Sequence, residues 1–148
     1  MLNKNIYMEQ ALQNAYTAKS LNEVPVGAVI VYKNNIVAST YNKMIANNNP
    51  CYHAEMLAIF DACKQLNSFR LNECALYTTL EPCVMCAGAI MHSRIEKLYF
   101  GAEDEKYGAI YNGAKIFYQP YPHKPEIYSG IYEKECKKLM QDFFKNKR

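Results

Sequence analysis

Two stretches decide the fold and the chemistry of this chain: His53-Ala54-Glu55 and Leu80-Glu81-Pro82-Cys83-Val84-Met85-Cys86-Ala87-Gly88-Ala89. One imidazole and two thiolates are suitable zinc ligands, and three protein ligands leave a fourth tetrahedral position for water, as in a catalytic zinc site. Taken singly, a Cys-x-x-Cys is also typical of a redox pair or of half a structural zinc site, and a lone histidine is usually an ordinary polar residue. Taken together, the two stretches predict a catalytic zinc held by His53, Cys83 and Cys86.

A carboxylate follows the histidine after one residue, at Glu55. Two thiolates cancel the formal charge of a zinc dication, so such a metal acidifies its water less than one with neutral ligands, and a nearby base becomes necessary. We therefore predict that Glu55 is the catalytic base.

Hydrophobic periodicity around these stretches predicts alternating helices and strands. Helices are expected over 8–20, 54–66, 82–92 and 133–145, and strands over 24–32, 36–41, 75–79, 97–100 and 126–129. The first two strands form a hairpin, and the strand-helix-strand unit over 75–100 implies parallel neighbours. The fold class is therefore α/β, with a mixed five-stranded sheet and helices on both faces in three α/β/α layers. Residues 101–121, rich in Tyr and Gly, show little period.

Both metal-ligand stretches follow the end of a strand and open a helix. Open α/β sheets place their binding sites at the edge where strands end, so we expect the two stretches to meet there.

Length and composition bound the class of protein. A length of 148 residues is typical of one domain, so we expect a single domain over 1–148. A net charge of +3 excludes a broadly polycationic coat for nucleic acid, and any such contact must be local. No apolar run approaches a membrane-spanning length, and the first ten residues lack the apolar core of a secretory signal, so no membrane partner and a cytoplasmic location are expected. The cysteines outside the zinc site are therefore expected to be reduced: Cys51, Cys63, Cys74 and Cys136.

Three further features have both a functional and an ordinary interpretation. Cys51 lies close enough to His53 to be a substitute ligand or a reactive thiol, although three ligand positions are already filled. His92 could bind metal or RNA, but is expected to be a surface residue. The C-terminus carries a group of aromatic and basic residues: Phe143, Phe144, Lys145, Lys147 and Arg148. This group is either a solvated face or a set of RNA contacts that combines base stacking with phosphate binding.

Several longer blocks extend the two stretches: Glu23-Val24-Pro25-Val26-Gly27-Ala28-Val29, His92-Ser93-Arg94-Ile95 and Phe100-Gly101-Ala102. With them, nearly the whole chain resembles the bacterial tRNA-specific adenosine deaminases of the cytidine deaminase-like superfamily, strongly to Gly108 and more loosely beyond it. The resemblance implies a cytidine deaminase-like fold, a homodimer with one Zn²⁺ per chain, and hydrolysis of adenosine to inosine at the wobble position of a tRNA anticodon. The target base in the anticodon stem-loop would be flipped into the pocket.

The resemblance also implies roles for single residues. His53, Cys83 and Cys86 match the family's zinc ligands, Glu55 its proton shuttle, Asn42 a residue that hydrogen-bonds the base, Val26 a residue lining the pocket, and Ala54, with Glu55, a backbone contact to the base. The chain departs from the family at Cys51-Tyr52 and at Ala109-Ile110-Tyr111-Asn112-Gly113.

Two other functions fit the same motifs. A small-molecule nucleobase deaminase, acting on guanine or cytosine, would use the same metal chemistry, and a non-catalytic RNA-binding subunit could keep the fold. The run from Thr79 to Gly88 and the basic, aromatic C-terminus favour tRNA, and Glu55 argues against a non-catalytic subunit, which needs no proton shuttle.

Overall fold

The computed structural model describes residues 4–147. Its helices are α1 (Lys4–Ser20), α2 (Ala54–Leu66), α3 (Val84–Ser93) and α4 (Glu133–Lys145), with a 3₁₀ turn, η1 (Ile116–Tyr118). Its strands are β1 (Gly27–Tyr32), β2 (Asn35–Tyr41), β3 (Cys74–Leu80), β4 (Lys97–Ala102) and β5 (Glu126–Ser129). None of the helices within 4–147 is both long and apolar enough to cross a bilayer.

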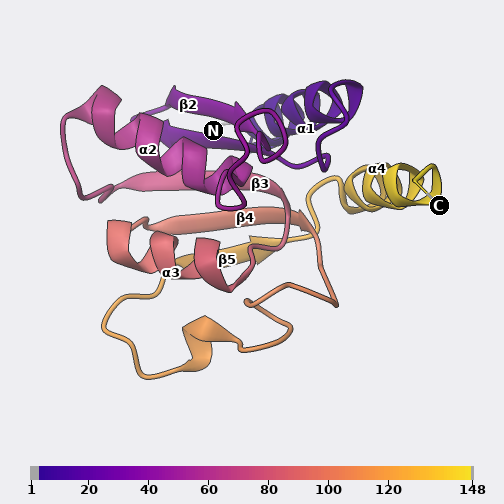
Figure 1. Cartoon of the computed structure of the whole chain (residues 1–148). Helices are drawn as coiled ribbons and strands as arrows, with labels where there is room; N and C mark the ends of the chain where they lie inside the picture. Colours follow the sequence, from indigo (N-terminus) through magenta and orange to yellow (C-terminus); the bar gives the residue numbers. More distant parts are fainter. Residues whose placement is uncertain (1–3, 148) are drawn as a thin grey trace.

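The strands form one sheet in the order β2-β1-β3-β4-β5. β1 is antiparallel to both β2 and β3, whereas β4 is parallel to β3 and to β5. The predicted hairpin is confirmed; its turn residues Lys33 and Asn34 both have positive φ, as tight turns that match the twist of a hairpin require. Because β2 and β3 run in the same direction, their carboxyl ends lie at the same edge of the sheet (Figure 1).

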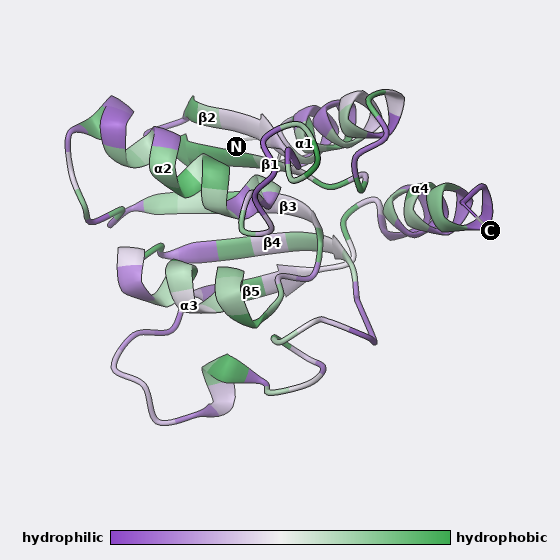
Figure 2. Ribbon diagram, in the orientation of Figure 1, coloured by the Kyte–Doolittle hydropathy of each residue, from purple (hydrophilic) through white to green (hydrophobic). Residues whose placement is uncertain are grey.

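Alternate residues of the strands face two separate cores, which confirms the three layers. Ala28 and Ile30 of β1 pack in the core that contains α2 and α3, whereas Val29 and Val31 pack with α1. Figure 2 shows the apolar residues concentrated on the inner strands and on α2 and α3. Continuous apolar strands of this kind are expected where helices cover both faces.

Helix α1 lies directly on β1. A Cβ atom at Gly27 would come within 1.9 Å of the carbonyl oxygen of Ala11, so only glycine permits this approach. Helix α4 packs beside α1, with Cys136 and Leu139 against Leu12 and neighbouring residues.

The predicted bounds of α2, β5 and α4 agree with the structure, and two helices start elsewhere. Helix α1 begins at Lys4, before the predicted Met8. Helix α3 begins at Val84 and not at Pro82, because Cys83 is an N-cap with extended backbone, φ −74° and ψ 177°. The turn η1 lies in the stretch that showed little period.

Candidate active site and metal centre

His53, Cys83 and Cys86 come together at the carboxyl edge of the sheet, where α2 and α3 begin. The Nδ1 atom of His53 lies 3.6 Å from the Sγ atom of each cysteine. All three ligand atoms lie within 4.8 Å of one another. One imidazole and two thiolates so arranged fit a zinc ion.

The starts of two helices set this geometry. His53 is the N-cap of α2 and Cys83 the N-cap of α3, both with extended backbone and neither with a side-chain capping bond. The side chains are thus left to face one another, while Cys86 projects from the first turn of α3. The partial positive charge of a helix N-terminus favours thiolates at these positions.

The protonation of the three groups is linked. Hydrogen bonds from Cys86 and from His53 lower the pKa of Cys83 to about 4, despite burial. The hydrogen bond with Cys83 and burial both raise the pKa of Cys86, and the hydrogen bond to Cys83 raises that of His53. Cys83 is thus the group of the three that loses its proton most readily, and a metal ion bound by the same atoms would compete with protons for them.

Glu55 lies in the first turn of α2, beside this group, with only 4% of its surface exposed. Burial raises the pKa of Glu55 to about 7, against the opposing charge of His53. A carboxyl group with a pKa near neutrality can both accept and return a proton, as acid-base catalysis requires.

Asn42 is buried at the end of β2 and holds the start of α2. Its Oδ1 atom accepts a hydrogen bond of 2.7 Å from the backbone N–H of Ala54. This bond fixes the orientation of the side-chain amide. The group through which Asn42 can bind another partner is therefore its Nδ2 donor. Asn42 therefore positions the residue next to His53, a role that its sequence position did not suggest.

Ala54 is fully buried, and its backbone is already engaged. Its N–H donates to Asn42, and its carbonyl oxygen accepts a 2.7 Å hydrogen bond from Thr40 Oγ1. Both backbone polar groups of Ala54 thus make hydrogen bonds within the protein, and the expected contact of the Ala54 backbone with the base stays a prediction. Val26, 6% exposed, adjoins Asn42, whose backbone N–H donates to the Val26 carbonyl oxygen at 3.2 Å.

Two substitutions separate the two roles of Asn42. Asn42→Asp keeps an acceptor for the N–H of Ala54 at a helix N-terminus but removes the Nδ2 donor, so we expect turnover to fall at least about tenfold with little change in melting temperature. Asn42→Ala leaves a buried N–H without a partner, so it should also lower stability, by about 1–3 kcal/mol. Calorimetry and single-turnover rates on both variants check this; a fully active Asn42→Asp enzyme would leave the side chain with the positioning role alone.

Two buried glutamates near the site have roles that sequence reasoning missed. Glu23 accepts hydrogen bonds from the N–H groups of Ile45 and Ala46, in the loop that leads to His53. Glu81, directly before Pro82-Cys83, accepts five hydrogen bonds from residues 104–112. Both glutamates lie in the sequence stretches that carry the resemblance to the family. An acidic residue within an otherwise apolar stretch was the feature that could have pointed to a buried, hydrogen-bonded role.

The C-terminal aromatic residues differ in their surroundings. Phe143 is 7% exposed on the inner side of α4, and the Nζ of Lys147 lies 5.2 Å from the centre of its ring. This corrects the expectation of base stacking by Phe143, because Cys136, Leu139 and Phe143 follow an i, i+3, i+7 spacing that turns Phe143 inward. Phe144 is 47% exposed, Lys145 and Lys147 are exposed, and Arg148 lies outside the described residues.

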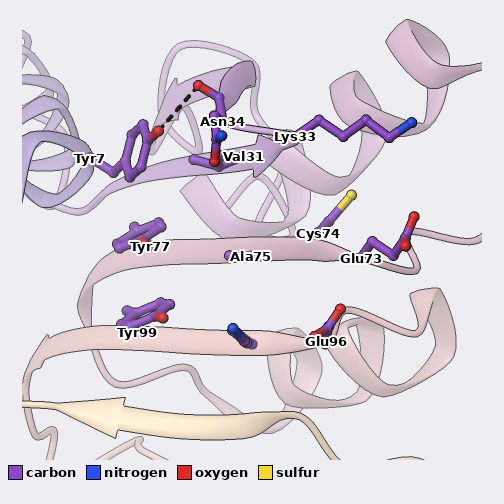
Figure 3. A pocket seen from close by; sticks show the side chains of 11 residues that line it. Tyr7, Val31, Lys33, Asn34, Glu73, Cys74, Ala75, Tyr77, Glu96 and Tyr99 are labelled. Carbon is purple, nitrogen blue, oxygen red and sulfur yellow. Dashed lines mark hydrogen bonds between the residues drawn. The ribbon is translucent and has the colours of Figure 1, made fainter. Parts of the chain in front are cut away.

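The other candidates lie apart from the metal group. Cys51 and His92 are exposed, and neither belongs to the ligand group found within residues 4–147. A cavity of about 180 Å³ lies at the opposite edge of the sheet, at the amino ends of β3 and β4, and is lined by Tyr7, Tyr77 and Tyr99 among others (Figure 3). It contains none of the predicted site residues.

A mixed five-stranded sheet with His and Cys-x-x-Cys ligands at two helix starts defines a class, the zinc-dependent deaminases. A family model described as the cytidine and deoxycytidylate deaminase zinc-binding region matches residues 1–102, and the chain belongs to that class. Within it, the chain is 47% identical over 144 residues to the tRNA-specific adenosine deaminase of Rickettsia bellii, covering 95% of this chain and 99% of the relative. The chain belongs to the tRNA-specific adenosine deaminase family.

Solved structures agree with this placement. One, from a study of A-to-I editing by tRNA:A34 deaminases at the wobble position of transfer RNA, superposes with a TM-score of 0.90 at 42% identity, covering 92% of this chain and 99% of that chain. A guanine deaminase from Bacillus subtilis is 38% identical, with a TM-score of 0.66, over 69% of this chain and 66% of its own. The likeness to the tRNA deaminase thus extends over more of the chain.

Proposed function

We propose that this chain deaminates adenosine to inosine by hydrolysis at the wobble position of a tRNA anticodon. The observation that carries the proposal is the full-length similarity to a tRNA-specific adenosine deaminase, 47% identical over 99% of that relative. The proposal includes a single catalytic domain with one Zn²⁺ per chain, a homodimer and a cytoplasmic location. Exposed apolar side chains on α2 and α3, Phe60 and Val84, are consistent with a partner subunit.

His53, Cys83 and Cys86 hold the zinc in this proposal. Bound there, the zinc would lower the pKa of a water molecule and so supply the nucleophile for attack at C6 of adenine. Glu55 takes the proton that the water loses and delivers it to the ring nitrogen next to C6. Glu55 then takes the second proton from the hydroxyl group now on C6 and passes it to the exocyclic amine. The bond between C6 and that nitrogen breaks, ammonia leaves, and C6 keeps the oxygen as the carbonyl group of inosine.

The base enters the site only when it is flipped out of its stack, because C6 is otherwise inaccessible. Asn42 offers its Nδ2 donor to an acceptor on the purine, while Oδ1 keeps its bond to Ala54. Val26, adjacent to Asn42, lines the pocket against the base, and the backbone at Ala54 and Glu55 completes the contacts. The flanking nucleotides and the stem supply much of the energy that positions C6.

The rest of the tRNA contact is local, because the net charge is only +3. Phe144 offers an exposed ring near the end of α4, and Lys145, Lys147 and Arg148 offer charge for phosphates. Helix α4 follows β5, beyond the carboxyl edge at which the metal group lies (Figure 1).

A panel of substrates tests the proposal. The zinc-loaded protein should form inosine at the first anticodon position of an adenosine-bearing tRNA, act more slowly on the isolated stem-loop, and leave free adenosine, cytidine and guanine almost unchanged. The reason is that a truncated substrate forfeits binding energy used to reach the transition state, so it loses maximal rate as well as affinity. Inosine is detected by nucleoside chromatography and ammonia by a coupled assay.

The competing function is deamination of a free base. The similarity to the Bacillus subtilis guanine deaminase is the reason to test it. Efficient release of ammonia from guanine or cytosine at matched enzyme concentration, with the tRNA unmodified, would replace the proposed function by this alternative. Ammonia from none of these substrates, with a normal zinc content, would instead favour a non-catalytic RNA-binding subunit.

A further inference from the structure

The carboxylate of Glu81 organises the chain segment next to a metal-ligand candidate. Glu81 is 2% exposed. Its Oε1 accepts from Asp104 N at 3.1 Å and from Asn112 Nδ2 at 2.7 Å. Its Oε2 accepts from the N–H groups of Ile110, Tyr111 and Asn112 at 3.0, 2.9 and 3.1 Å. Five donors compensate the loss of hydration of one buried carboxylate, so residues 104–112, here the Glu81-held segment, have their path set by this charge.

The Glu81-held segment is also fixed against Cys83. Gly108 pairs with Cys83 in an isolated antiparallel bridge, and Ala109 N donates to the Pro82 carbonyl oxygen at 2.9 Å. A Cβ atom at Gly108 would lie 2.5 Å from Oε2 of Glu81, so only glycine allows the segment this close. The backbone of the residue before Gly108 is therefore held in a fixed position next to Cys83.

That residue is Tyr107, whose side chain is exposed. It is 65% exposed, although its backbone N–H is held at 3.1 Å by Oδ1 of Asp104. The Nζ of Lys106 lies 5.2 Å from the centre of its ring. An exposed aromatic ring with an ammonium group beside it, on a fixed backbone, is the combination with which proteins hold single-stranded nucleotides.

We propose that Tyr107 stacks on a nucleotide adjacent to the edited adenosine, and that Glu81 is the positioning residue that keeps Tyr107 in place. The inference rests on the proposed tRNA substrate. When the target base is flipped out, its neighbours lose a stacking partner, and an aromatic ring at the mouth of the site replaces that partner. Tyr107 thereby favours RNA whose flanking nucleotide is splayed in this way.

The nearby charges specify what kind of contact this is. Glu103, Asp104 and Glu105 precede Lys106, so the local field does not attract phosphates strongly. Stacking must therefore contribute more than charge at this position. The part of the affinity that depends on Tyr107 should accordingly change little between low and high salt, unlike phosphate contacts.

The first experiment compares Tyr107→Ala and Tyr107→Phe in zinc-loaded protein, with Tyr118→Ala as a control matched in exposure (64%) on η1. Tyr107→Ala should lower kcat/KM on the anticodon stem-loop by about 5- to 100-fold, mostly through KM, which is the range of one base–aromatic stack. Tyr107→Phe should stay within about twofold because a stacked ring needs no hydroxyl, and Tyr118→Ala should do so because Tyr118 lies outside residues 104–112. A stem-loop with 2-aminopurine beside the target adenosine reports stacking directly: wild type should quench its fluorescence and Tyr107→Ala should not.

The second experiment tests Glu81 through non-additivity. Glu81→Gln keeps the side-chain shape but replaces one acceptor oxygen by a donor, so it should raise KM at least as much as Tyr107→Ala, with zinc content unchanged. In the double variant, Tyr107→Ala should add less than about a twofold loss, since residues that act as one unit do not add. Should Glu81→Gln not fold, Asn112→Ala removes one of the five bonds to Glu81, the 2.7 Å bond to Oε1, together with a 3.2 Å bond to Glu103 Oε1, and should raise KM by a smaller factor.

The outcomes separate this inference from the proposed function. If the wild-type protein forms inosine and the Tyr107→Ala variant shows a normal KM and normal quenching of 2-aminopurine, the stacking role of Tyr107 is wrong. The proposed function then still stands. Fully additive losses for Tyr107→Ala and Glu81→Gln or Asn112→Ala overturn the positioning role of Glu81. Wild-type protein that forms no inosine on tRNA overturns the proposed function, and this inference falls with it.

Discussion

Glu55→Gln protein is expected to keep its zinc and lose at least about a thousandfold in turnover, within the range attributed to a general acid-base group that acts more than once in a reaction. Glu55 lies outside the group of ligand atoms formed by His53, Cys83 and Cys86, so metal content should not change. Glutamine fills the same buried volume but cannot carry a proton between water and substrate.

The matched control for this variant lies on the same helix. Asp61→Asn removes a carboxylate from the exposed side of α2 and should leave turnover within about twofold, as for surface substitutions that touch no partner. Single-turnover inosine formation on tRNA and metal analysis of the same samples measure both quantities. A Glu55→Gln enzyme within tenfold of wild type would assign the proton transfers to another group.

The sequence predicted what depends on periodicity and on the order of elements. Helix α2 and helix α4 have the predicted bounds because each shows a one-sided apolar stripe that tertiary packing then buries. The meeting of His53 with Cys83 followed from two strands that end at one edge, and the 3.6 Å distances confirm that they meet.

The sequence did not predict structure that depends on single polar side chains. Residues 104–112 show no hydrophobic period, and their path is set instead by five hydrogen bonds to Glu81, which lies 23 to 31 positions before the donors. The bond from Ala54 to Asn42 was missed for the same reason. Phe143 was expected at a nucleic-acid contact because of its basic neighbours, and the helical spacing that buries it was the stronger signal.

Cys86→Ser is expected to abolish stoichiometric zinc and to lower the melting temperature by roughly 10 °C. Zinc bound a thousandfold above its dissociation constant stabilises the fold by about 4 kcal/mol, and each kcal/mol shifts the melting temperature of a domain of this size by roughly 2–4 °C. Cys86 is fully buried and its Sγ is one of the three ligand atoms, so a serine hydroxyl there replaces a soft ligand by a weak one.

A chelator distinguishes loss of metal from loss of packing. Wild-type protein treated with chelator should melt close to Cys86→Ser, and the same treatment should leave the Cys86→Ser melting temperature unchanged. Cys136→Ser is the matched control, because Cys136 is buried between α4 and α1, away from the metal group. It should lose stability through a buried hydroxyl, yet retain zinc and still respond to the chelator. If Cys86→Ser protein held one zinc per chain and still melted lower on chelation, Cys86 would not be a ligand, and the metal would have to be held by a different set of residues.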